Sequence, residues 1–272
     1  MVTNLVRRGL QVKILFLGDV VGRPGRQAIK MFLKNYVSEH CIDVVIANGE
    51  NAAGGNGITK EIAKELFSYG IDALSMGNHI WDKKEVLGFI DNEDRIIRPA
   101  NYPPGTPGKG YTILKTKKGS KLGLLNLSGR VFLSNLDCPF RIGEQMVKEL
   151  QAITKNIIVD FHAEATSEKV AFGWFMDGKV SAVCGTHTHI QTSDYRILPK
   201  GTAYITDVGM TGPRDSVLGV KSELVIKKFL TQMPVRFEVA SGIMQVNGVV
   251  IELFADGKAK HIEPLVLIVQ EN

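Results

Sequence analysis

Acidic, amide and imidazole side chains recur in this chain of 272 residues just after short apolar runs. Imidazole, carboxylate and amide oxygen together suit manganese, iron or zinc. A carboxylate can also bridge two such ions, and two-metal sites of that kind cleave phosphate esters. The pattern therefore predicts a metal site for phosphoester chemistry, whose candidates are Asp19, Glu50, Asn78, His162, His187 and His189.

The runs that precede these residues must bring them together. Residues 12–17, 44–47, 157–160 and 180–184 are apolar and rich in β-branched side chains, which predicts buried strands. The carboxyl ends of parallel strands meet at one edge of a sheet, so residues far apart in sequence converge there. His187 and His189 share a face if their backbone is extended, and serve different ions if it turns.

The remaining pattern alternates strands with helices and predicts an α/β chain with mainly parallel strands and an antiparallel C-terminal part. We find no linker, and so predict one domain over 1–272, with a core at 12–267 and an N-terminal extension at 1–11. Further strands are expected at 71–75, 122–127, 194–198, 202–205, 245–254 and 259–269, and helices after Pro24, Thr59 and Asp82 and near 144–153 and 221–230.

The composition is that of an ordinary globular protein, with 44% hydrophobic and 22% charged residues and a net charge of +5. Three cysteines, an odd number without metal-binding spacing, predict free thiols and a reducing compartment. The N-terminus lacks the apolar stretch of a signal peptide, and no window approaches the ~20 apolar residues of a membrane span. We therefore expect a cytoplasmic protein without a membrane partner.

The motifs resemble those of the calcineurin-like metallophosphoesterases, with two departures. Val20 and Val21 follow Asp19, so the first histidine of that superfamily is missing, and the pair Glu50-Asn51 stands where it has a bridging aspartate. Both departures resemble the YmdB-like branch of bacterial phosphodiesterases. The similarity covers about 12–267 and includes the segments 18–26, 48–55, 77–82, 98–102, 160–164, 185–192 and 207–212.

This resemblance implies a four-layer αββα sandwich of two mixed β-sheets and two iron ions, with manganese or zinc as alternatives. It also implies that Asn51 joins the ligands, that Glu50 bridges the ions and that His79 is the general acid. One ion would be held by Asp19, Glu50, Asn51 and His189, and the other by Asn78, His162 and His187. The substrate mouth would be lined by Asn101, Thr211 and Gly212.

The implied reaction is hydrolysis of phosphodiesters, notably 2′,3′-cyclic nucleotides. A hydroxide bridging the ions would attack phosphorus in line with the leaving oxygen, and His79 would donate a proton to that oxygen. Because Asn51 replaces a nitrogen ligand with a weaker oxygen ligand, we expect lower metal affinity at its position.

Two other readings stay open at this point. A metal-dependent amidohydrolase also uses a His-X-His pair, although that pair normally comes on the first strand of a barrel and here falls at 187–189. A regulatory protein could use the metals to hold a nucleotide or RNA, although no RRM or KH motif is present. The apolar stretch Pro264 to Val269 and the resemblance favour a homo-oligomer.

Overall fold

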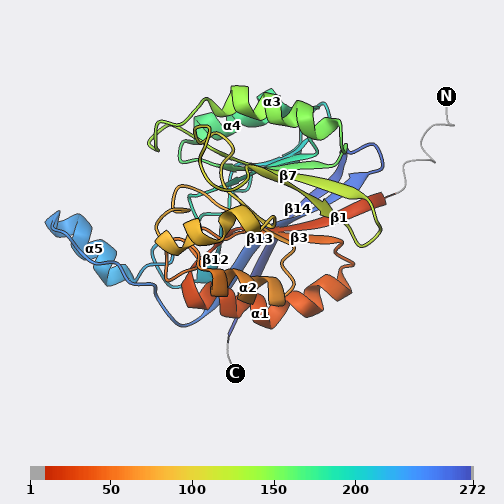
Figure 1. Ribbon diagram of the computed structural model, residues 1–272. Helices are drawn as coiled ribbons and strands as arrows, with labels where there is room; N and C mark the ends of the chain where they lie inside the picture. Colours follow the sequence, from red (N-terminus) through yellow and green to blue (C-terminus); the bar gives the residue numbers. More distant parts are fainter. Residues whose placement is uncertain (1–9, 271–272) are drawn as a thin grey trace.

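The computed structural model describes residues 10–270 and is dominated by two mixed β-sheets that face each other (Figure 1). The first sheet has the strand order β2-β12-β13-β1-β3-β4-β5, with β14 also paired to β13. Its strands are β1 (Leu10–Leu17), β2 (Asp19–Val20), β3 (Val44–Asn48), β4 (Ala73–Ser75), β5 (Ile96–Ile97), β12 (Met210–Pro213), β13 (Met244–Phe254) and β14 (Ala259–Val269). The predicted N-terminal extension lies largely outside the described residues.

The second sheet has the order β10-β11-β9-β8-β7-β6, in which β7, β8, β9 and β11 run parallel. Its strands are β6 (Tyr111–Lys115), β7 (Lys121–Ser128), β8 (Ile157–His162), β9 (Ala182–Thr186), β10 (Arg196–Ile197) and β11 (Ala203–Ile205). A buried apolar cluster lies between the sheets and includes Ile14 and Phe16 from β1 and Leu124 and Ile158 from the second sheet. The sheets are thus held together face to face.

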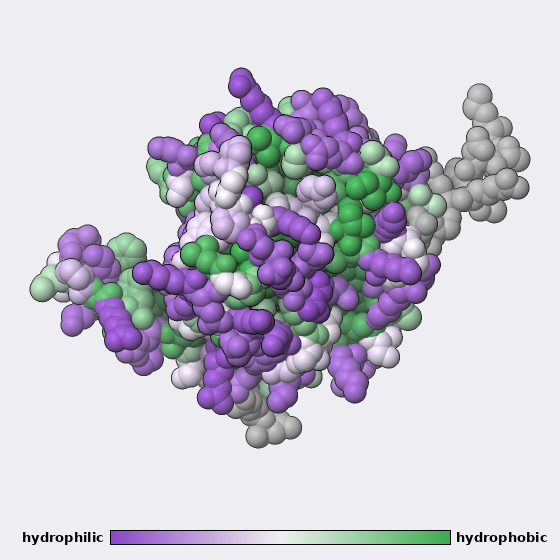
Figure 2. Space-filling model, in the orientation of Figure 1, coloured by the Kyte–Doolittle hydropathy of each residue, from purple (hydrophilic) through white to green (hydrophobic). Residues whose placement is uncertain are grey.

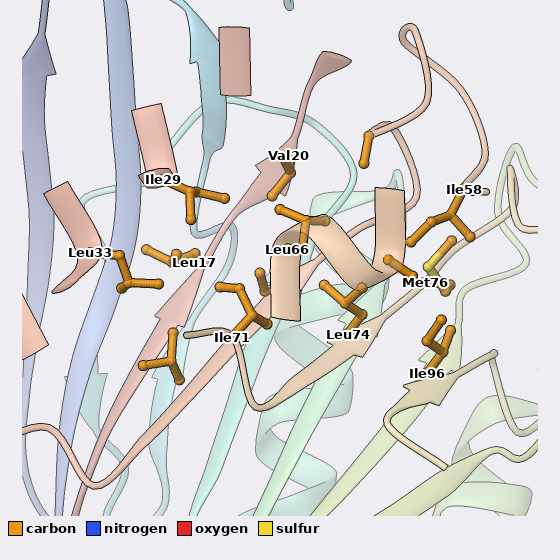
Figure 3. Close-up of a cluster of buried hydrophobic side chains, with 14 of the residues drawn as sticks. Leu17, Val20, Ile29, Leu33, Ile58, Leu66, Ile71, Leu74, Met76 and Ile96 are labelled. Atoms are coloured by element: carbon orange, nitrogen blue, oxygen red, sulfur yellow. The ribbon is translucent and has the colours of Figure 1, made fainter. Parts of the chain in front are cut away.

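Helices cover the outer face of each sheet (Figure 1). α1 (Gly22–Glu39) and α2 (Lys60–Ser68) lie over the first sheet, and α3 (Pro139–Gln151) and α4 (Thr166–Met176) lie over the second. Figure 3 shows the apolar contact of the first pair, where Ile29 of α1 and Leu66 of α2 meet strand residues such as Leu17. α5 (Ser222–Thr231) instead projects from the body.

The prediction of an α/β chain with two mixed sheets is confirmed, and Thr59 caps α2 by accepting a hydrogen bond from the Ile62 amide. The helix expected after Asp82 is wrong: only two short 3-10 turns form there, at Lys84–Gly88 and Ile90–Asn92. α4 was not expected, since its residues show little amphipathic periodicity. Within residues 10–270, every helix is too short or too polar to cross a membrane.

Candidate metal centre

A buried polar network joins the two sheets where their parallel strands end. Asp160 of β8 accepts hydrogen bonds from Ser75 of β4 at 2.5 Å and from Asn48 of β3 at 3.1 Å. Its other oxygen accepts from Thr186 of β9 at 2.6 Å. The Thr186 hydroxyl also lies 2.9 Å from Nδ1 of His162, so this network fixes the imidazole with Nε2 facing outward.

Three donor atoms surround that nitrogen. His162 Nε2 lies 3.1 Å from Glu50 Oε1, 3.1 Å from Asn78 Oδ1 and 3.0 Å from His187 Nδ1. Atoms that bind one transition-metal ion at ~2.1 Å stand about 3 Å apart, so these spacings match a shared ion. We call Glu50, Asn78, His162 and His187 the inner cluster. Each comes from the end of a different strand, as the sequence predicted.

A second group adjoins Glu50, and we call Asp19, Asn51 and His189 the outer cluster. The amide nitrogen of Asn51 is 3.2 Å from Glu50 Oε1 and 3.1 Å from Nε2 of His189. Oδ1 of Asp19 lies 3.8 Å from the same His189 nitrogen. The structure therefore brings all seven predicted ligands into one continuous group.

Two observations test whether these residues fit metal ions. Asp19 is fully buried, yet its Oδ1 has no hydrogen-bond partner, a costly arrangement that a cation would relieve. Gly77 lies against Glu50 and His162, and a Cβ at that position would collide with both side chains. The glycine thus leaves room where the donor atoms converge, and the donor set fits metal binding.

The close packing of these titratable side chains shifts their pKa values. Burial alone would raise the pKa of Glu50, but His162 and the His79 backbone outweigh it and lower the pKa to about 2. Burial alone would lower the pKa of His162, but Glu50, Asp19 and Asp160 raise it to about 9. Burial and the adjacent His162 lower the pKa of His187 to about 3.

The pKa of Asp19, the carboxylate of the outer cluster, shifts in the opposite direction to that of Glu50. Burial raises the pKa of Asp19 to about 6, even though the charges of His189 and His162 favour its ionised form. A carboxylate so desolvated gains most from a nearby cation.

The segment that carries His187 and His189 is a turn, which decides between the two geometries left open by the sequence. β9 ends at Thr186, and the next histidines adopt left-handed backbone with φ of 101° for His187 and 65° for His189. Such values are uncommon outside glycine and are typical of functional sites. The two imidazoles consequently reach different clusters.

Asp207 and Lys169 hold this turn in place. Asp207 accepts hydrogen bonds from the Thr188 amide at 3.0 Å and the Thr188 hydroxyl at 2.9 Å. The buried ammonium of Lys169 lies 2.7 Å from Asp207 and also donates to the Thr186 carbonyl. Sequence reasoning missed Lys169, because a lysine in a helix normally lies at the surface.

His79 follows Asn78 but lies outside both clusters. Its backbone amide donates to Glu50 Oε2 at 3.1 Å, and its Nδ1 lies 2.8 Å from Asp82. The side chain is 39% exposed, so its other nitrogen is accessible from solvent beside the centre. A carboxylate that holds one imidazole nitrogen fixes which nitrogen can exchange a proton with a substrate.

The residues expected at the substrate mouth are buried. Asn101 and Thr211 are fully buried, and Gly212 lies in the buried strand β12. The Asn101 amide is used within the protein, since it donates to the carbonyls of Ser128 and Asp137 and accepts from the Ser128 amide. Their place at the substrate mouth stays a prediction.

Two packed mixed sheets carry carboxylate, amide and imidazole groups at their shared edge. Together with its phosphodiesterase and phosphatase relatives, this arrangement defines the class, a hydrolase of phosphoric diesters. The particular family follows from the sequence: the model of the YmdB-like protein family matches residues 15–265, and the chain belongs to that family.

Proteins that are similar in sequence or in structure support this family assignment. The 2′,3′-cyclic-nucleotide 2′-phosphodiesterase of Bacillus subtilis (strain 168) is 54% identical over 242 residues, which cover 89% of this chain and 91% of that protein. A crystal structure described as a novel phosphatase from Mycoplasma pneumoniae has a TM-score of 0.90 and 36% identity, and covers 97% of this chain and 96% of that one. A hypothetical protein from Thermus thermophilus has a TM-score of 0.89 and 42% identity, with 94% of this chain and 99% of that one covered.

Proposed function

We propose that this protein is a dinuclear metal-dependent phosphodiesterase that hydrolyses 2′,3′-cyclic nucleotides. The observation that carries the proposal is the convergence of three donor atoms around His162 Nε2 at 3.0–3.1 Å, beside an unpartnered buried carboxylate oxygen. The sheets and their helices would form the four-layer αββα sandwich of metallophosphoesterases, with 1–272 as one catalytic unit.

The ligands divide between two ions. Asn78, His162 and His187 would hold the inner ion, Asp19, Asn51 and His189 would hold the outer one, and Glu50 would contribute to both. Asn51 takes part through its carbonyl oxygen, which a half-turn of the amide brings to where its nitrogen now faces Glu50. The mixed nitrogen and oxygen set would accept iron, manganese or zinc, and the family resemblance makes iron the first choice among them.

When bound, the two ions supply an acidified water and neutralise charge that grows on the phosphoryl oxygens. The chain's own part is to hold the ligands rigidly, and Asp160, Thr186 and Asp207 do so through hydrogen bonds at the strand ends. A preorganised site of this kind needs no rearrangement as charge develops.

His79 delivers the proton to the leaving sugar oxygen. Asp82 holds Nδ1 at 2.8 Å and so leaves Nε2 to act as the donor toward the substrate. General acid catalysis of this sort contributes about 10²–10⁴ in rate. The hydrogen bond from the His79 backbone amide to Glu50 fixes the position of His79 relative to the metal centre.

The substrate class rests on the relative from Bacillus subtilis, whose name specifies 2′,3′-cyclic nucleotides. Asn101, Thr211 and Gly212 shape the mouth from beneath, by fixing the segments around it. Free thiols at Cys41, Cys138 and Cys184 support a location in the reducing cytoplasm.

A substrate panel on the metal-loaded protein tests this function. We expect hydrolysis of 2′,3′-cyclic AMP to a nucleoside monophosphate, weaker hydrolysis of bis-p-nitrophenyl phosphate, and none of the amide dihydrouracil. Turnover of dihydrouracil alone would establish an amidohydrolase instead. Tight binding of the cyclic nucleotide without turnover would establish a regulatory binding protein.

A further inference from the structure

Glu164 is a carboxylate beside the inner cluster to which the proposed function assigns no role. It follows His162 closely, between the end of β8 and the start of α4. Its Oε2 lies 3.0 Å from Nε2 of His187, and its side chain is 47% exposed. Much of the visible surface over α3 and α4 is hydrophilic (Figure 2), so a charged residue in that layer is ordinary. The contact with an expected metal ligand is what distinguishes Glu164.

The contact bears on which nitrogen of His187 faces the inner cluster. Nδ1 of His187 lies 3.0 Å from Nε2 of His162, and the other ring nitrogen lies against Glu164. A neutral imidazole has one N–H donor and one nitrogen with a free lone pair. A carboxylate at Nε2 favours the N–H there, so the lone pair of Nδ1 is directed toward the inner cluster, where a metal ligand needs it.

His187 depends on such a contact because its backbone belongs to no strand. It follows the end of β9 and has φ of 101°. Its amide donates to Oδ2 of Asp19 at 3.2 Å, a bond that fixes the backbone but not the rotation of the ring. Within residues 10–270, the polar contact of Nε2 is with Glu164. Glu164 therefore holds the ring from the solvent side.

The segment that carries Glu164 is anchored to the same strand end as His187. The Ala163 amide donates to the Thr186 carbonyl at 3.4 Å, and Nζ of Lys169 in α4 donates to the same carbonyl at 2.7 Å. Thr186 directly precedes His187. The two side chains thus project from segments that share one buried anchor, which sets the distance between them.

Glu164 also adds negative charge to the solvent side of the centre. Asp82 does the same at His79, where it lies 2.8 Å from the ring and is 35% exposed. No arginine or lysine of residues 10–270 forms a hydrogen bond or an ion pair with His79 or with the seven expected ligands. A phosphodiester carries one negative charge, whereas a phosphomonoester approaches two at neutral pH. Because repulsion is proportional to each charge, Glu164 disfavours the monoester more strongly.

We propose that Glu164 is a positioning residue that holds His187 toward the inner ion, and that its charge disfavours doubly charged phosphomonoesters at the centre. The inference rests on the proposed function, because hydrolysis of a phosphodiester yields a phosphomonoester. Water adds to phosphorus and the bond to the sugar oxygen breaks, so the product gains a second ionisable oxygen. The charge of Glu164 consequently favours release of the product.

Calorimetric titration of the metal-free protein with Mn²⁺ tests the positioning role. Glu164→Ala removes the contact, whereas Glu164→Gln keeps an oxygen that can accept the same hydrogen bond. We expect Glu164→Ala to weaken the inner ion by about 10–100-fold and Glu164→Gln to stay within about threefold of wild type, as for other partners of metal-bound histidines. The outer ion and the circular dichroism should not change. Wild-type affinity in Glu164→Ala, or an equal loss in both variants, would overturn the positioning role.

Binding of the product to the metal-loaded protein tests the charge. Glu164→Gln should bind adenosine 3′-phosphate about tenfold tighter and 2′,3′-cyclic AMP about threefold tighter than wild type, because the repulsion that it removes grows with the charge of the ligand. Calorimetry measures the product, and KM measures the substrate. Unchanged product affinity, or the same gain for both molecules, would overturn the role of the charge.

Glu263→Gln is the matched control. Glu263 on β14 is 50% exposed and also contacts a histidine, since its Oε2 lies 3.4 Å from Nε2 of His261. It should keep the metal and product affinities of wild type, and changes equal to those of Glu164→Gln would overturn the inference.

The inference and the proposed function can fail separately, because metal titration and product binding need no turnover. If wild type hydrolyses 2′,3′-cyclic AMP and the affinities do not respond to Glu164, the inference alone is wrong. If wild type shows no turnover but Glu164→Ala still loses the inner ion, the positioning role stands and the proposed function alone is wrong.

Discussion

The outer cluster contacts Glu50 of the inner cluster through Asn51, but the two clusters are built differently. His162 of the inner cluster is fixed by a buried network from both sheets, and its donor neighbours stand at 3.0–3.1 Å. In the outer cluster, Asp19 and His189 are 3.8 Å apart, and His189 is held by a carbonyl at the root of a projecting arm. The difference teaches that buried hydrogen bonds from both sheets fix the central histidine of the inner cluster, whereas the histidine of the outer cluster is held by a single loop carbonyl.

The largest expected effect comes from the middle of the inner cluster. His162→Ala should remove the inner ion and lower turnover of 2′,3′-cyclic AMP by at least about 10³-fold, because the site loses both a ligand and its preorganised charge. Metal analysis and steady-state rates measure this. His261→Ala, at an exposed histidine on β14, should keep wild-type metal content and rate. Equal rates in His162→Ala and His261→Ala would contradict the assignment.

His79 should matter for the reaction and not for either cluster. His79→Ala should lower turnover of 2′,3′-cyclic AMP by about 10²–10³-fold, because the sugar oxygen is a poor leaving group that needs a proton. The same change should alter hydrolysis of bis-p-nitrophenyl phosphate much less, since p-nitrophenolate leaves unprotonated. Metal content should stay as in wild type. A uniform loss on both substrates would remove His79 from proton transfer.

Asp160 tests whether the inner cluster owes its rigidity to the network. Asp160→Asn should weaken the affinity for the inner ion by about 10–100-fold, because partners of a metal-bound histidine orient the ring. Affinity for the outer ion should change little. Calorimetric titration of the metal-free protein separates the two. An equal loss at both ions would show that the clusters are not independent.

The smallest effect is expected at Asn51. Asn51→Ala should weaken the outer ion by about tenfold and leave the inner ion unchanged, since a neutral amide oxygen is the weakest ligand of the set. The same titration in wild type should already show two unequal steps. Equal affinities for the two ions in both wild type and Asn51→Ala would contradict the distinction between the inner and outer clusters.

Particular residues show which parts of the site could be predicted from the sequence. Asp19, Glu50 and His162 follow apolar runs, so the rule that parallel strands share an edge was enough to bring them together. Asn51 needed the family resemblance, because an amide after an acid is equally an ordinary turn residue. The helices α1 and α2 followed from apolar spacing and caps.

Other features could not be predicted, because they depend on contacts and burial that only the three-dimensional structure shows. Lys169 supports the histidine turn from inside a helix, and nothing in its neighbourhood distinguishes it from a surface lysine. Asn101 lies in a loop yet is fully buried, and nothing in its sequence neighbourhood indicates that burial. The apolar spacing of α5 predicted a helix but could not tell a buried face from an open one.

The central claim is that this chain holds two transition-metal ions that its phosphodiesterase activity requires. The most direct measurement is elemental analysis of purified protein, with the rate on 2′,3′-cyclic AMP followed in the same sample through chelation and metal return. We predict close to two ions per chain, loss of turnover when they are removed, and recovery when iron or manganese is restored. Full turnover in protein freed of metal would contradict the claim.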